Sequence, residues 1–300
     1  MDVDCIANGR DVLGEGPCWV APEARLYWFD IKQARLSWIE PASGRRGGWT
    51  LGVRASAAAA CAFGGLIAAT EAGLAHIDTE TGALRMVQPV ELGPGFRSND
   101  GKIDPAGRFW WSRMDDDGGA RPGSVYRTDP DGSTRRVLEG IHIPNTLACS
   151  PDGKTLYVAD SKHGVLNAHH VGPDGALGEA RAFADACGGE ATPDGSAVDA
   201  EGYLWNAQWG GWRIVRYAPD GAVDRILQAP VSQPTSCAFG GPDLDVLFIT
   251  SAREGLSEEA LSAQPLAGGL FACRPGVRGL PLPAFEGFPA TPVADLRRLS

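Results

Sequence analysis

Four oxygen-bearing side chains recur along the chain at long, regular intervals. Glu15, Asn99, Asn145 and Asp194 are separated by 84, 46 and 49 residues. Each offers a carboxylate or an amide carbonyl oxygen, and no soft ligand accompanies them at metal-ligand spacing. Oxygen-only ligand sets suit Ca²⁺, Mg²⁺ or Mn²⁺ better than thiolate-seeking metals. If the fold brings these side chains together, the pattern predicts a site for a divalent cation.

The ordinary interpretation of such residues is structural. Asp and Asn commonly start turns, and Pro-Asp-Gly occurs at 130–132, 151–153, 173–175, 193–195 and 219–221. Asp194 differs from the other turn aspartates in its position, because it lies eight residues before the turn glycine Gly202. Glu15 lies between two glycines and could be a solvated loop charge, although those glycines also permit a tight backbone path.

The elements that would position these residues are short strands joined by tight turns. Aromatic-rich runs recur at 26–29, 108–111, 155–158, 203–206 and 246–249, most of them directly after a turn signal such as Asp-Pro-Ala-Gly at 104–107. Proline presets the first turn angle and glycine supplies a positive φ, so each cluster predicts a β-hairpin. The 40 glycines and 22 prolines agree with many short elements.

Aligning the hairpins gives a repeat. The aligned positions are 15, 55, 99, 145, 194 and 236, and the steps between them are 40, 44, 46, 49 and 42 residues. This is the period of a propeller blade of four antiparallel strands. We therefore predict an all-β fold, a six-bladed β-propeller forming a single domain over residues 1–300, with the N-terminal segment supplying the outer strand of the last blade. Equivalent positions near the start of each inner strand would then form a ring at one mouth of the central channel.

Composition excludes several classes of function. The net charge of −10 argues against a nucleic-acid or anionic-membrane surface. The longest nearly apolar run, Ala57 to Ala69, holds 13 residues, whereas a membrane helix needs about 20. The seven cysteines at 5, 18, 61, 149, 187, 237 and 273 form no CxxC pair, and the chain start has no basic segment typical of a secretory signal. We expect mostly reduced cysteines in a cytoplasmic protein.

At these residues the sequence resembles the regucalcin / senescence marker protein / gluconolactonase family. The matching stretches run in family order across almost the whole chain; they are Leu13-Gly-Glu-Gly-Pro17, Arg97-Ser-Asn-Asp-Gly-Lys102, Pro144-Asn145, Tyr157-Val-Ala-Asp-Ser161, Pro193-Asp-Gly195 with Asp199-Ala-Glu-Gly202, and Thr250-Ser-Ala-Arg-Glu-Gly255. Each stretch is weak alone, and their joint order makes the match specific. The family is a six-bladed propeller, in agreement with the repeat count.

The resemblance implies roles for individual residues. Glu15, Asn145 and Asp194 match the family's three protein ligands to one divalent cation, which could be Ca²⁺, Zn²⁺, Mn²⁺, Mg²⁺ or Fe²⁺. Arg97 and Asn99 match residues that contact substrate. The family's usual Gly-Thr-Met reads Ser-Arg-Met at 112–114 here, and an acidic loop follows at 115–119, so no substrate contact is carried over from that loop.

The expected function is metal-dependent hydrolysis of a sugar aldonolactone, either gluconolactone or a pentonolactone such as arabinono- or xylonolactone. Asp194 would also orient or deprotonate the attacking water. Two alternatives stay open at this stage: a phosphotriesterase-like or general esterase propeller, and a calcium-binding propeller without catalysis. The sequence identifies neither the sugar nor the native metal, and it is compatible with a monomer or a small homo-oligomer.

Overall fold

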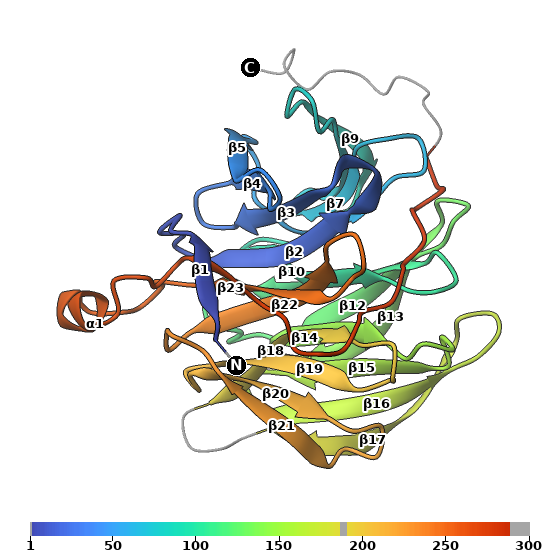
Figure 1. Ribbon diagram of the computed structural model, residues 1–300. Coiled ribbons are helices and arrows are strands. Elements are labelled where there is room, and N and C mark those ends of the chain that lie inside the picture. The colour runs from blue at the N-terminus through green and yellow to red at the C-terminus, as the bar shows by residue number, and fades with distance from the viewer. Residues whose placement is uncertain (1, 187–190, 289–300) are drawn as a thin grey trace.

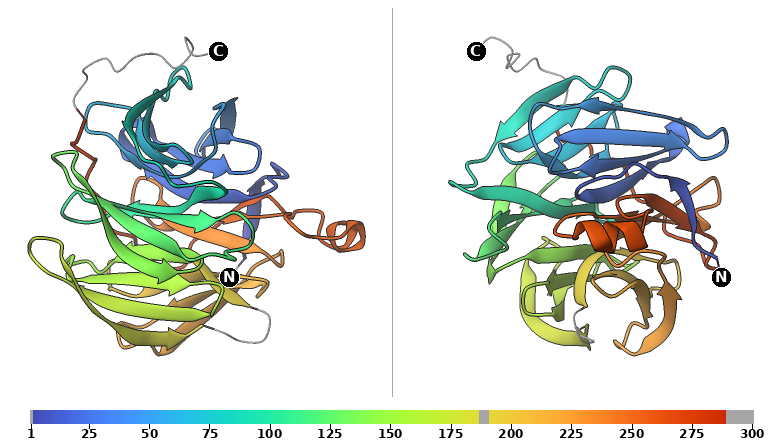
Figure 2. Two further views of the ribbon diagram at one scale, coloured as in Figure 1. Left: turned by 180° about the vertical axis from the view of Figure 1, so that it is seen from behind. Right: turned by 90° about the vertical axis from the view of Figure 1, so that its left-hand side faces the viewer.

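Six four-stranded antiparallel sheets are arranged around one central axis in the computed structural model, which describes residues 2–186 and 191–288 (Figures 1 and 2). The inner strands β2, β6, β10, β14, β18 and β22 pack against one another in a closed ring. The predicted six-bladed propeller is therefore confirmed.

The strands follow one another from the channel outwards in each blade. The first two blades hold β2 (Gly14–Val20), β3 (Arg25–Asp30), β4 (Arg35–Glu40) and β5 (Arg45–Thr50), then β6 (Ala55–Ala60), β7 (Leu66–Thr70), β8 (Gly73–Ile77) and β9 (Leu84–Pro89). The next two hold β10 (Phe96–Ile103), β11 (Phe109–Asp115), β12 (Gly123–Thr128) and β13 (Thr134–Ile141), then β14 (Pro144–Cys149), β15 (Thr155–Asp160), β16 (Val165–Val171) and β17 (Leu177–Asp185). The fifth holds β18 (Thr192–Val198), β19 (Leu204–Trp209), β20 (Arg213–Tyr217) and β21 (Val223–Gln228).

The sixth blade is assembled from both halves of the chain. It holds β22 (Pro234–Gly240), β23 (Val246–Ser251) and β24 (Leu270–Cys273), and its outer strand is β1 (Asp4–Ala7), which pairs antiparallel with β24. The N-terminal segment therefore closes the ring, as the sequence predicts. A short helix, α1 (Glu258–Ala263), lies between β23 and β24 and projects in front of the ring (Figure 2, right).

The hairpin turns explain the recurring sequence signal. In the third blade, Oδ2 of Asp104 accepts from the indole Nε1 of Trp110 at 2.8 Å, while Oδ1 accepts two backbone amides of the turn. In the fifth blade, Asp199 accepts from Trp205 Nε1 at 2.9 Å in the same way. The turn aspartate thus satisfies both the turn and the buried indole, so the repeat of Asp, Gly and aromatic residues is a folding signal.

The apolar residues lie between the blades, and the cysteines lie among them. Trp110, Trp111, Trp205, Tyr27 and Phe29 are among the large side chains with no exposed surface. The six cysteines within the described residues are unpaired, as expected, and Cys187 lies outside the described residues. No helix in the described part of the chain is long and apolar enough to cross a membrane.

Candidate cation and substrate site

All four predicted ring residues lie on inner strands, near the strand start, and all are buried. Glu15 is in β2, Asn99 in β10, Asn145 in β14 and Asp194 in β18. Since every inner strand starts at the same mouth of the channel, the fold brings them together as the repeat predicts.

A β-bulge recurs at the ring position of every blade. The pairing of each inner strand with its second strand shifts at the same place in all six blades; the shifts lie at 15–18, 55–57, 98–101, 145–148, 193–196 and 234–236. A bulge leaves residues unpaired in the ladder and re-aims their side chains. The ring is therefore a repeated backbone feature.

A glycine follows each of the two carboxylate residues, and neither glycine position has room for a side chain. Gly16 after Glu15 has φ +57°, and a Cβ there would lie 2.1 Å from the carbonyl oxygen of Ser56. A Cβ on Gly195 after Asp194 would lie 2.1 Å from Ser236 Oγ. The neighbouring blade thus approaches the backbone beside each carboxylate too closely for any side chain.

Asn145, Asn99 and Arg97 form one hydrogen-bonded chain. Asn99 Nδ2 donates to Asn145 Oδ1 at 3.0 Å, and Arg97 Nη1 donates to Asn99 Oδ1 at 2.7 Å. Asn145 Nδ2 donates to Ser161 Oγ at 2.8 Å, so its carbonyl oxygen is the atom that faces Asn99. The two predicted substrate-binding residues therefore adjoin a predicted cation ligand.

Thr146 and Ser161 tie the blade of Asn145 to the blade of Asp194. Thr146 Oγ1 donates to the carbonyl oxygen of Asp194 at 2.5 Å. Ser161 Oγ, which accepts from Asn145, donates to the carbonyl oxygen of Pro193 at 2.6 Å. Thr146 has φ +61°, which is unusual for a β-branched residue. Backbone strain next to a candidate ligand is thus held in place by hydrogen bonds between blades.

Burial raises the pKa of both carboxylates, and neighbouring carboxylates add to this effect. Burial, together with the nearby carboxylate of Asp100, raises the pKa of Glu15 to about 8. Burial, and then Glu15 and Asp100, raise the pKa of Asp194 well above its ordinary value. Arg97 acts in the opposite direction on both groups, and Lys102 on Glu15.

This arrangement fits a divalent cation held by oxygen ligands. Glu15 and Asp194 converge while buried, and a cation between them would offset the repulsion that raises their pKa values. No three His, Cys, Asp or Glu side chains are arranged to hold a metal within residues 2–186 and 191–288. A cation here would therefore use the Asn145 amide as its third protein ligand, together with water.

The acidic loop after β11 holds the substrate-side arginine. Asp116 accepts from Arg97 Nε at 2.8 Å, from Arg54 Nη1 at 2.6 Å and from Lys32 Nζ at 3.0 Å. These three cations hold the pKa of Asp116 well below its usual range, against the effect of burial. Asp116 is thus an anchor for Arg97. The preceding Asp115 has a different partner, because Arg121 donates to both of its carboxylate oxygens.

The thiols of the inner strands β2 and β22 are poor nucleophiles at neutral pH. Burial raises the pKa of Cys18 to about 11 and the pKa of Cys237 to about 12. Since the thiolate is the reactive form, neither side chain suits covalent catalysis.

Three site residues were missed by sequence reasoning although signals for them exist. Asp100 and Lys102 lie within the stretch that contains Arg97 and Asn99, and Asp116 lies in a run of three aspartates. Ser161 ends the family-like stretch at 157–161, whereas Thr146 carries no signal beyond following Asn145 directly.

Comparison with known proteins finds relatives across nearly the whole chain. The model of the SMP-30/Gluconolactonase/LRE-like region matches residues 13–253. A 6-deoxy-6-sulfogluconolactonase from Pseudomonas putida is 37% identical over 94% of this chain and 98% of that protein. An L-arabinolactonase from Azospirillum brasilense is 35% identical over 95% of both chains. The structure of regucalcin from Agrobacterium tumefaciens, described as a calcium-binding protein, matches with a TM-score of 0.89 and 35% identity, covering 94% of this chain and 96% of that one.

Proposed function

The chain belongs to the SMP-30/Gluconolactonase/LRE-like family, and we propose that it is a sugar lactonase that hydrolyses an aldonolactone with one divalent cation. The relatives named for lactonase activity support the reaction class. The observation that carries the proposal is the convergence of Glu15, Asn145 and Asp194 at one mouth of the channel, beside Arg97 and Asn99.

In this proposal Glu15, Asn145 and Asp194 hold the cation. When bound, the cation supplies electrophilic polarisation of the ester carbonyl. Asp194 orients the attacking water and accepts its proton. Arg97 and Asn99 hold hydroxyl groups or the carbonyl oxygen of the lactone, which fixes the direction of attack.

Arg97 has a second part in the proposal. Its guanidinium is buried beside two carboxylates, and it offsets negative charge as the tetrahedral intermediate forms. Asp116 keeps Arg97 in the required orientation through its hydrogen bond to Nε. We further propose that residues 1–300 act as one domain and that the enzyme works in the cytoplasm, which the unpaired cysteines among the described residues support.

The test is acid release from a panel of aldonolactones in a weakly buffered indicator assay, before and after chelation and with metal added back. Asp194→Asn removes the proposed base, and turnover should fall by roughly 10²–10⁴-fold. Asp152→Asn is the matched control, because it changes the same Pro-Asp-Gly tripeptide in an exposed turn. The spontaneous opening rate of each lactone is subtracted.

The outcomes separate the candidate functions. Chelator-sensitive hydrolysis of one lactone, lost in Asp194→Asn and kept in Asp152→Asn, supports the proposal. Near wild-type turnover in Asp194→Asn with metal bound would refute the assigned mechanism. Turnover of aryl esters or organophosphates in preference to lactones would favour a different hydrolase, and cation binding without any turnover would favour a binding protein.

A further inference from the structure

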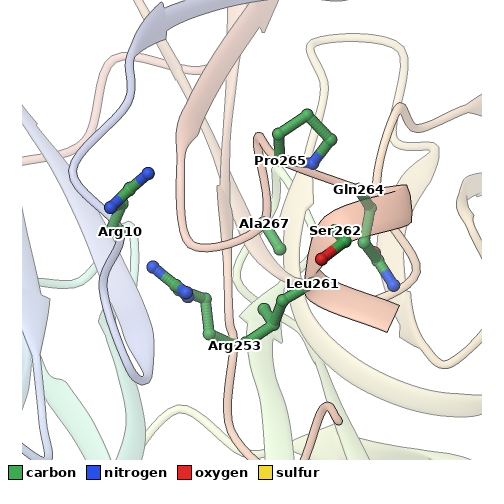
Figure 3. Close-up of a pocket in the computed structure, with 7 residues that line it drawn as sticks. All are labelled: Arg10, Arg253, Leu261, Ser262, Gln264, Pro265 and Ala267. Carbon is green, nitrogen blue, oxygen red and sulfur yellow. The ribbon is translucent and has the colours of Figure 1, made fainter. Parts of the chain in front are cut away.

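A cavity of about 290 Å³ opens near the end of β23, on the face of the ring where the inner strands start. Figure 3 shows the guanidinium group of Arg253 directed toward Arg10, with Leu261 beside Arg253 and Gln264 on the far side from Arg10. The two arginines come from the loop before β2 and the loop after β23.

Neither guanidinium has an ion pair or a side-chain hydrogen bond within the described part of the chain. The arginines around the candidate site behave differently: Arg97 and Arg54 each pair with Asp116. Acidic neighbours of the cavity have other partners, since Glu254 pairs with Lys32 at 3.0 Å and Asp11 accepts from an indole. Glu258 and Glu259 of α1 do not line the cavity. Two like charges therefore face one cavity without a counter-charge, in a protein of net charge −10.

Backbone hydrogen bonds hold the two loops that carry the arginines, whose side chains are exposed in Arg10 and half-buried in Arg253. The amide of Arg253 donates to the carbonyl oxygen of Val12 at 3.0 Å, and the amide of Asp11 donates to the carbonyl oxygen of Gly268 at 2.8 Å. A Cβ on Gly268, which has φ +73°, would lie 2.3 Å from the carbonyl oxygen of Asp11. The loop that carries Arg10 is thus packed tightly against the segment that forms the cavity wall.

The cavity adjoins the candidate site through a series of charged contacts. Lys32 Nζ lies 3.0 Å from Glu254 Oε1 and 3.0 Å from Asp116 Oδ1. Asp116 holds Arg97, and Glu254 is the residue that follows Arg253. The cavity is therefore at the rim of the same mouth of the channel.

We propose that Arg10 and Arg253 form a binding site for a tetrahedral or planar oxyanion, such as a sulfonate, phosphate or carboxylate group. Two guanidinium groups offer several N–H donors in forks that match such oxygens. An oxyanion between them would also remove their mutual repulsion. The oxyanion is either a substituent of the lactone substrate or a separate, free anion. The first case rests on the function proposed above.

Binding of inorganic sulfate is the first test, because it requires no turnover. Sulfate is titrated calorimetrically into the full-length wild type and into Arg10→Met, Arg253→Met and Arg135→Met. Arg135 is the control, since it is an exposed arginine of β13 far from the cavity in sequence. We expect saturable binding that weakens about tenfold or more in each cavity variant and stays unchanged in the control. No saturable binding, or an equal loss in Arg135→Met, overturns the proposal, and thermal melting checks that each variant is folded.

The second test identifies the source of the anion. KM is measured for glucono-lactone and for its 6-phosphate. The KM for the 6-phosphate divided by the KM for the unmodified lactone is then compared between wild type and Arg253→Met. A ratio that rises about tenfold, with sulfate as a competitive inhibitor, assigns the anionic group to the substrate. An unchanged ratio with loss of sulfate binding assigns the site to a free anion. If no lactone is hydrolysed by the wild type, the proposed function fails while the sulfate titration still decides this proposal.

Discussion

Substitution of Thr146 separates two effects that one residue combines in this structure. Its hydroxyl donates to the carbonyl oxygen of Asp194 at 2.5 Å and contacts Ser196 Oγ at 3.0 Å, while its backbone has φ +61°. The hydroxyl therefore connects the strands of two candidate ligands, and the backbone conformation costs free energy for any residue with a Cβ.

The expected changes follow from these contacts. Thr146→Ala removes three hydrogen bonds, since Asn206 Nδ2 also donates to this hydroxyl at 3.2 Å. At about 1 kcal/mol for each bond and about 0.8 kcal/mol for the buried methyl, the free energy of unfolding falls by about 3–4 kcal/mol. Thr146→Gly loses the same groups but relieves the left-handed backbone, which recovers about 1 kcal/mol relative to Ala. Thr146→Ser keeps the hydroxyl and loses only the methyl, so its free energy of unfolding should fall by about 0.8 kcal/mol.

Cation affinity should follow a different order. The Thr146 hydroxyl holds the backbone carbonyl of Asp194 in place. The Thr146→Ala and Thr146→Gly variants should therefore bind the cation about 10–100-fold more weakly, whereas Thr146→Ser should not. Urea unfolding in the presence of a chelator measures stability without a contribution from the cation, and calorimetry measures the affinity. The reasoning is refuted if the Thr146→Gly variant is no more stable than the Thr146→Ala variant. It is also refuted if both variants bind the cation as tightly as wild type.

Two further predictions concern other carboxylates. Asp116→Asn removes the charge that holds Arg97, which in the proposed mechanism both binds the lactone and offsets charge in the transition state, so kcat/KM should fall about tenfold. An unchanged kcat/KM in steady-state assays would contradict this role. Asp11 is buried, and burial raises its pKa to about 6 from 3.8. Since folding favours its neutral form, wild-type stability should fall as pH rises from 3.8 to about 6, by up to about 3 kcal/mol, whereas Asp11→Asn should lack this decrease in melts at several pH values. Identical profiles would show that Asp11 is not responsible.

The repeat could be predicted because the turn signal is strong in several blades and fixes the period for the others. The turn aspartate, the glycine with positive φ and the buried aromatic residue occur at fixed offsets, as at Asp104, Gly107 and Trp110. Glu15 and Asp194 could then be placed at one mouth of the channel by symmetry, without any knowledge of contacts between distant residues.

The supporting contacts could not be predicted because they depend on distances between blades. The sequence shows Asp115, Asp116 and Asp117 as one acidic run, yet Asp116 faces Arg97 while Asp115 faces Arg121. Only the geometry of the loop separates neighbouring carboxylates in this way. The bulge at each ring position was also invisible, because its residues have no common side chain.

The sixth blade is completed only when the two ends of the chain pair, so the geometry of the inner ring depends on the whole chain being folded. β1 at residues 4–7 pairs with β24 at residues 270–273, so this contact joins segments separated by most of the sequence. Contacts of such long range carry an entropy cost of loop closure and slow folding. The first and sixth blades then meet where Thr235 Oγ1 donates to the carbonyl oxygen next to Glu15, at 2.5 Å. A cation bound at the channel mouth would therefore stabilise the closed propeller relative to every partly folded state, because its protein ligands come together only when the ring is closed.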